Sequence, residues 1–214
     1  MQPLIGVMTG PEMKYRAKQA LTALIAIAGL RDHGPHLASG SEIELLDAYS
    51  RKASERLHPY LFVYPTITTS LGNRSLLRLS ESAFKATILD AAKALRSLQI
   101  ERITVISNSK KDLEVSKETL AQLEGKKKSM GIWELHPKIA ELEGEDPLAI
   151  GNAFLTAQML YIQPGMVKPE MLRYADASFG VSGDPKKASA EIGKKIFDQT
   201  FESFVSELDM FMRE

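Results

Sequence analysis

One short segment of the chain concentrates side chains that bind metal ions or transfer protons. It contains Arg31, Asp32, His33, His36 and Glu42. A Gly-Pro pair separates the two histidines and predicts a sharp turn between them. Imidazole and carboxylate are common zinc ligands, but a closed metal site needs three or four of them. The segment therefore predicts a metal site only if other loops add ligands; otherwise these are hydrogen-bonded loop histidines.

The sequence argues against several other kinds of site. It has no cysteine, which excludes disulfides and thiolate metal sites. Neither the Gly-x-x-x-x-Gly-Lys-Ser/Thr loop nor Gly-x-Gly-x-x-Gly occurs, and no serine lies in a Gly-x-Ser-x-Gly elbow. Lys plus Arg (27) balances Asp plus Glu (27), so no overall field favours nucleic acid or an anionic membrane as a partner.

Four short apolar runs, with helical patterns between them, predict alternating strands and helices. The runs are residues 24–28, 60–64 (stopped by Pro65), 103–106 and, more weakly, 130–133. Continuous runs of this length are typical of strands buried on both faces. Helical patterns cover residues 42–57, 80–98, 112–123, 148–161 and about 187–211. This alternation predicts an α/β fold with a mainly parallel central sheet flanked by helices.

Length and composition favour one globular domain over residues 1–214. The chain is 44% hydrophobic and 25% charged, close to the average of soluble proteins. Its longest apolar stretch, residues 21–30, is too short to span a bilayer, and its start lacks a signal-peptide pattern. We therefore expect a cytoplasmic protein with no membrane partner. The lysine-rich residues 125–129 predict a charged surface turn.

In open α/β sheets, ligands bind at the loops that follow the carboxyl ends of the parallel strands, so we expect a ligand site there. Those loops are residues 29–41, 65–80, 107–111 and 136–152. His58 and His136 each precede a proline and have no metal-ligating side chain at ligand spacing. We interpret both as structural or surface residues. Asp184, in a Gly-Asp-Pro turn, is interpreted as a turn former or helix cap.

The segment with the two histidines resembles the signature of the creatininase (creatinine amidohydrolase) family. In that family an acidic residue, a spacer and His-Gly-Pro-His-Leu follow the first strand, and an Asp closes the segment. Two later segments are also similar: Gly-Val-Ser-Gly-Asp-Pro with Ala-Ser-Ala-Glu-Ile-Gly (residues 180–185 and 188–193), and Tyr-Ile-Gln-Pro-Gly-Met-Val (161–167). The matches keep their order over about residues 21–208. The resemblance implies a three-layer creatininase-like domain.

Family members are typically metal-dependent amidohydrolases with two divalent ions, and the resemblance implies that this site is degraded here. The first acidic ligand falls on Arg31, whereas the first histidine is kept as His33. The closing Asp falls on Glu42, one methylene longer. If a metal is bound at all, the resemblance leaves His33 and Glu42 to hold zinc or manganese.

The later ligand positions have also lost their ligands. The second histidine falls on Ser109, and a position acidic in some members falls on Lys111. A histidine that the family uses near the substrate falls on Asn152. A cation placed about 4 Å from a bound ion meets about 4 kcal/mol of repulsion per pair of unit charges at a dielectric of about 20. Alternatively, Arg31 and Lys111 replace the ions and pair with Glu42 and Asp32. The candidate pocket residues are Arg31, Asp32, His33, His36, Glu42, Ser109, Lys111 and Asn152.

The resemblance therefore favours a non-catalytic or metal-free family member with no cofactor, acting by small-molecule binding or by assembly. The alternative is a divergent amidohydrolase that cleaves a non-peptide C–N (amide) bond with zinc or manganese; a third reading is an anion-binding enzyme without metal. The family also implies a homo-oligomer. The last helix has many apolar residues, which serve either assembly or the chain's own sheet: Phe197, Phe201, Phe204, Met210, Phe211 and Met212.

Overall fold

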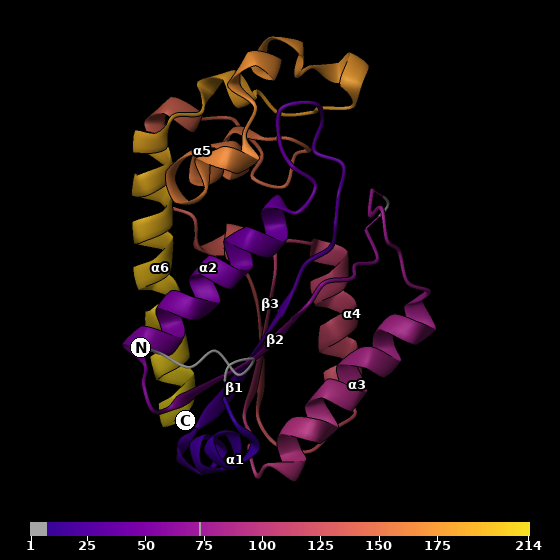
Figure 1. Cartoon of the computed structure of the whole chain (residues 1–214), viewed down its shortest axis with the longest axis vertical. Helices are drawn as coiled ribbons and strands as arrows, with labels where there is room; N and C mark the ends of the chain where they lie inside the picture. Colours follow the sequence, from indigo (N-terminus) through magenta and orange to yellow (C-terminus); the bar gives the residue numbers. More distant parts are fainter. Residues whose placement is uncertain (1–7, 73) are drawn as a thin grey trace.

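The structure is a computed structural model that describes residues 8–72 and 74–214. A four-stranded parallel sheet forms its centre. The strand order is β2-β1-β3-β4. The strands are β1 (Thr22–Ile27), β2 (Leu61–Ile67), β3 (Ile103–Ser107) and β4 (Lys127–Gly131). Helices lie on both sides of this sheet (Figure 1). The α/β class and the parallel sheet expected from the alternation of elements are confirmed.

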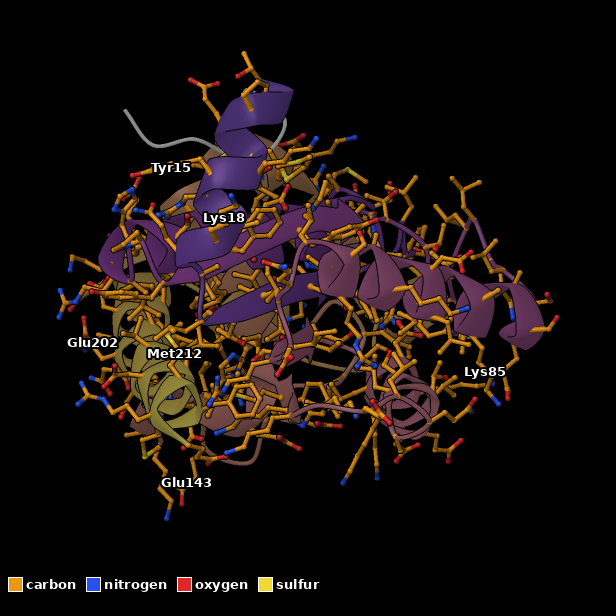
Figure 2. All side chains as sticks on the ribbon, turned by 90° about the horizontal axis from the view of Figure 1, so that it is seen from below. Tyr15, Lys18, Lys85, Glu143, Glu202 and Met212 are labelled. Atoms are coloured by element: carbon orange, nitrogen blue, oxygen red, sulfur yellow. The ribbon has the colours of Figure 1, made fainter. Side chains whose placement is uncertain are left out.

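Each face of the sheet is covered by its own set of helices. On one side lie α2 (Ser41–Arg56), α5 (Ala153–Ile162) and α6 (Ala190–Arg213); on the other lie α3 (Glu81–Ser97) and α4 (Lys110–Leu120). The short helix α1 (Gly10–Gln19) packs at the end of the sheet where β1 begins. Figure 2 shows the charged Lys85 and Glu202 extending outward on opposite sides of the molecule.

The central strand β1 is buried along its whole length because it faces both layers. Leu24 and Ala26 belong to the core under α2, α5 and α6, whereas Ile25 and Ile27 belong to the core under α3 and α4. Successive side chains of a strand point to opposite faces, so an uninterrupted apolar run fills both cores. This is the physical reason why the run was recognisable as a buried strand.

The two edge strands differ from their predicted limits. β2 does not stop at Pro65 but continues to Ile67, and an edge strand tolerates proline because one side of it needs no ladder hydrogen bond. The lysine-rich segment is not only a turn, since β4 begins at Lys127. Lysines are common on edge strands, and Lys128 forms an ion pair with Glu207 of α6. Helix α1 was not predicted, because its residues carry little apolar periodicity.

The long C-terminal helix α6 buries its apolar side chains within the chain. Five of the six residues singled out above are buried, and only Met210 is largely exposed, at 49%. The helix thus offers no surplus apolar face, and the homo-oligomer stays a prediction from the family resemblance alone. None of the described helices is long and apolar enough to cross a lipid bilayer.

Helices α5 and α6 approach closely at Gly193. A Cβ atom at this position would overlap the carbonyl oxygen of Ala157 on α5. Glycine therefore permits the contact, and the contact fixes α5, whose N-cap residue Asn152 lines the candidate site.

We predict that Gly193→Ala lowers the free energy of unfolding by about 2–3 kcal/mol, because the added methyl group must push the two helices apart. Urea unfolding followed by circular dichroism measures this change. Gly165→Ala is the matched control, since a Cβ there meets nothing within 4 Å. Equal stability of the two variants would contradict the prediction.

Candidate functional site

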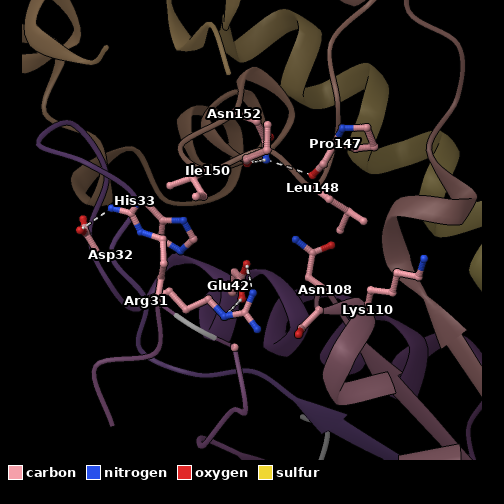
Figure 3. Close-up of a pocket in the computed structure, with 14 residues that line it drawn as sticks. Arg31, Asp32, His33, Glu42, Asn108, Lys110, Pro147, Leu148, Ile150 and Asn152 are labelled. Atoms are coloured by element: carbon pink, nitrogen blue, oxygen red, sulfur yellow. Dashed lines mark hydrogen bonds and ion pairs between the residues drawn. The ribbon is translucent and has the colours of Figure 1, made fainter. Parts of the chain in front are cut away.

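A pocket of about 240 Å³ opens where the loops after three strands meet the start of α5. The loop after β1 contributes Arg31, Asp32 and His33, and Glu42 adds to them from the first turn of α2. Gly72 and Arg74 come from the loop after β2, and residues 108–110 from the loop after β3. Residues 147–150 and Asn152 close the other side (Figure 3). The pocket thus lies at the carboxyl ends of the strands, as expected for an α/β sheet.

The Arg31 guanidinium lies between two buried carboxylates. Its Nε is 3.3 Å from Glu42 Oε2, and its Nη2 is 3.2 Å from Asp112 Oδ2. The side chains of Arg31, Glu42 and Asp112 are 15%, 7% and 0% exposed. Arg31 Nη2 also donates to Ser70 Oγ at 2.8 Å. One cation therefore pairs with two buried acidic groups, of which Glu42 lines the pocket.

The surrounding backbone is shaped to hold this cluster. A Cβ at Gly72 would lie 2.9 Å from Arg31 Nη2, so the absence of a side chain there leaves room for the guanidinium. Asp112 accepts hydrogen bonds from Ser70 Oγ at 2.6 Å and from the Leu71 amide at 2.7 Å. It also lies in the first turn of α4, where the helix dipole favours a negative charge. These contacts fix the position of Asp112 beside Arg31.

Glu42 has a different environment from Asp112. Burial raises the pKa of Glu42 to about 7; the Arg31 charge opposes this shift and the Asp112 charge adds to it. Glu42 Oε2 contacts Arg31 as an ion pair but accepts no hydrogen bond from the described residues. Its carboxyl group can therefore gain or lose a proton near neutral pH.

His33 is held neutral inside the same pocket. Burial, with smaller contributions from the Arg31 charge and from His36, lowers the pKa of His33 to about 4. Its Nε2 is buried and has no hydrogen-bond partner among the described residues, and the same holds for Asn108 Oδ1. Figure 3 shows both side chains facing the hollow above Arg31 and Glu42. Unpaired polar atoms of this kind are available to a bound molecule.

His36 lies behind the pocket and supports α5. Its Nε2 is 3.0 Å from Thr156 Oγ1, which donates its own proton to the Asn152 carbonyl at 2.8 Å. The hydroxyl can therefore only accept from His36, so His36 carries its proton on Nε2. Burial lowers the pKa of His36 to about 4. This histidine positions the start of α5 and does not line the pocket.

Six of the eight predicted site residues line the pocket: Arg31, Asp32, His33, Glu42, Ser109 and Asn152. Lys111 does not; it is exposed, and Lys110 lines the pocket in its place. The reason is that α4 begins at Lys110, so successive side chains turn about 100° around the helix and Asp112 points inward.

Arg31 contacts Glu42 as predicted. Neither Arg31 nor Lys111 forms the predicted contact with Asp32. Asp32 instead forms a partly exposed ion pair with Arg74 at 2.8 Å. Asp112 takes the place of the second carboxylate. Ser70, Asn108 and Asp112 were missed as site residues because their roles arise from contacts between distant loops, which no local pattern reveals.

Ser109 and Asn152 serve the fold as well as the pocket, since each caps a helix. Ser109 Oγ accepts from the Asp112 amide at the start of α4. Asn152 Oδ1 accepts from the Leu155 amide at 2.7 Å, and its Nδ2 donates to the Pro147 carbonyl at 3.0 Å. Caps of this kind contribute about 1 kcal/mol each. Both residues therefore hold helix ends at the pocket wall.

The described part of the chain contains no group of three or more His, Asp or Glu side chains arranged to hold a metal ion. Glu42 and Asp112 are the two buried carboxylates at this site, and Arg31 already pairs with both. Arg31 therefore uses the acidic groups that a divalent ion would need.

We predict that Arg31→Ala lowers the free energy of unfolding by about 3 kcal/mol, because removing one partner of a buried ion pair leaves uncompensated carboxylates. The matched control is Arg51→Ala, which breaks a more exposed pair with Glu44 on α2 and should change stability by less than about 1 kcal/mol. Urea unfolding at neutral pH compares the two variants. A loss in Arg31→Ala no larger than in the control would contradict a stabilising role for the cluster.

A second prediction concerns acid stability and His36. The pKa of His36 is about 4 in the folded chain and about 6.5 in an unfolded chain. The unfolded state therefore binds more protons between these values, and the free energy of unfolding falls as pH drops from about 6.5 to about 4. In His36→Gln this decline should be shallower by up to about 1.4 kcal/mol per pH unit. Urea unfolding across that range measures it; parallel curves for the two proteins would contradict the assignment.

Comparison with known proteins agrees with this architecture. A search among curated proteins finds no match. A crystal structure of creatinine amidohydrolase (creatininase) superposes with a TM-score of 0.84 at 16% identity, covering 100% of this chain and 99% of that one. A mutant creatininase complexed with creatine gives 0.82 at 17% identity, with 100% of both chains covered. A putative creatinine amidohydrolase from Bacteroides fragilis NCTC 9343 gives 0.73 at 13% identity, covering 98% and 96%.

These structural similarities show a shared fold. The sequence itself matches the family model described as "Creatininase: Creatinine amidohydrolase" over residues 7–208, which is nearly the whole chain. The matched region includes every residue of the pocket described above. The chain therefore belongs to the creatininase family.

Proposed function

We propose that this chain is a metal-free member of the creatininase family that binds a small molecule in the pocket at the carboxyl ends of β1, β2 and β3. The observation that carries this proposal is the position of Arg31 between Glu42 and Asp112. The Arg31 guanidinium occupies the space beside these two carboxylates, where a metal ion would otherwise bind them.

The residues present do not fit the dinuclear metal centre that the family resemblance implies. Two divalent ions bring about four positive charges, which need several carboxylates to offset them. Here both buried carboxylates are already paired with one guanidinium, and His33 is the only imidazole among the pocket-lining residues. An ion entering beside Arg31 would meet charge repulsion and too few ligands.

The pocket retains the features of a binding site for a small polar molecule. His33 Nε2 and Asn108 Oδ1 have no partner among the described residues and face the hollow. The aliphatic side chains of Leu148 and Ile150 form part of the opposite wall. Convergent polar atoms opposite an apolar wall are typical of ligand pockets.

The alternative function is a divergent amidohydrolase that cleaves a non-peptide amide bond. One observation favours it: the pKa of Glu42 is about 7, so this carboxylate lies in the range where a general base works best at neutral pH. Glu42 also lines the pocket, where a substrate amide would bind.

Metal analysis separates the two functions. We expect tag-free protein, dialysed without chelator, to contain far less than one equivalent of zinc or manganese and to leave creatinine unhydrolysed. Arg31→Ala should gain manganese affinity, because it frees Glu42 and Asp112 beside His33. The gain is measured by calorimetry and by a rise in the melting midpoint on adding MnCl₂.

Arg51→Ala serves as the control and should show neither change. A stoichiometric metal that survives dialysis of the unaltered protein would contradict the metal-free function and support the amidohydrolase. If Arg31→Ala folds but gains no manganese affinity, Arg31 is not the group that keeps metal out.

A further inference from the structure

The charged side chains that line the pocket do not balance one another. Three are cations and two are carboxylates. Arg31 pairs with Glu42, and Arg74 pairs with Asp32. The remaining cation is Lys110, for which no ion pair is formed with another described residue. The lining therefore has one positive charge in excess, and that charge belongs to Lys110.

Asp112 does not offset this excess at the surface of the pocket. Its side chain is 0% exposed and is absent from the pocket lining. Its carboxylate is engaged by Arg31, by Ser70 Oγ and by the Leu71 amide. Lys110, in contrast, is exposed and lines the pocket. A molecule that enters the pocket therefore meets the ammonium group of Lys110 at the rim before it reaches the buried carboxylates.

The start of helix α4 adds to the positive potential on this side. The helix is eleven residues long and begins at Lys110. The amides of Asp112 and Leu113 donate to the hydroxyl and the carbonyl of Ser109. The two preceding amides, of Lys110 and Lys111, have no acceptor among the described residues. Free N–H groups at a helix N-terminus, together with the helix dipole, favour anionic oxygen atoms.

Two buried side chains beside this helix start point to a bound polar molecule independently of the helix. Asn108, directly before Ser109, is 6% exposed, and its Oδ1 has no hydrogen-bond partner among the described residues. His33 is 5% exposed, and its Nε2 is likewise unpaired. Both side chains line the pocket and face the hollow (Figure 3). Buried polar side chains are seldom left unsatisfied unless water or a ligand completes the site.

We propose that the small molecule bound in this pocket carries an anionic oxygen group, a carboxylate or a phosphate, which binds to Lys110 and the first amides of α4. This inference rests on the binding function proposed above and names the chemistry of the ligand. The rest of the ligand is short and partly apolar. The pocket volume of about 240 Å³ is small for a ligand site, and Leu148 and Ile150 form its aliphatic wall.

Molecules that share one four-carbon tail test the charge preference. The probes are butyrate and butyl phosphate; butylammonium and 1-butanol are the controls. Calorimetry at fixed ionic strength measures each affinity. We expect saturable binding of at least one anion, at least about tenfold tighter than either control, because only the anions complement the spare charge. The stronger of the two anions identifies the group. Equal affinity for butylammonium, or no saturable binding of either anion, would overturn the proposal.

Variants of α4 assign the anion to Lys110. Lys110→Glu replaces attraction by repulsion and should weaken binding of the anion at least about tenfold. Lys110→Arg keeps the charge and should retain most of the affinity. Lys117→Glu, the same change in the last turn of the same helix, should leave the affinity unchanged. Melting midpoints establish that each variant is folded before titration. Equal affinity of the unaltered protein and folded Lys110→Glu would overturn the proposal.

Treatment with EDTA separates a failure of this inference from a failure of the proposed function. Anion binding that is lost after dialysis against EDTA would contradict both, because the anion would then depend on a bound metal. Metal-free protein that binds no anion contradicts the ligand class alone. Stoichiometric metal, together with anion binding that resists EDTA and depends on Lys110, contradicts the metal-free function alone.

Discussion

The pairing of Arg31 with two buried carboxylates is the interaction on which the rest of the site depends. It joins four separate parts of the chain: the loop after β1, Ser70 in the loop after β2, and the first turns of α2 and α4. Burying three charges is costly unless each is paired and hydrogen-bonded. The cluster therefore tolerates little displacement, and it fixes how the loops meet above the sheet.

The architecture was readable from the sequence where burial left a local pattern. The run at β1 is apolar throughout because both faces of the strand are covered, and the pattern over residues 80–98 matches α3 with Ser80 as its N-cap. The limits of β4 were misplaced because an edge strand accepts lysines, which also mark turns. Helix α1 has no pronounced apolar stripe, so its sequence resembles that of a loop.

The candidate site was only partly predictable. The spacing of Arg31, His33 and Glu42 around a strand end and the next helix start was sufficient to bring them together. Asp112 was missed because its role depends on Ser70 and Leu71, about forty residues away in the sequence. Whether Lys110 or Lys111 reaches the pocket depends on the residue at which α4 begins, and helix limits are the least certain part of any sequence pattern.

The cluster also has a consequence for how such a sequence can change over time. Glu42 and Asp112 are acceptable in the core only while Arg31 is present, and Gly72 leaves space for that guanidinium alone. A substitution at any one of these positions is therefore harmful unless another changes with it. The residues are expected to vary together among close relatives. Arg31 is therefore difficult to replace, because Glu42 and Asp112 are tolerated in the core only beside it.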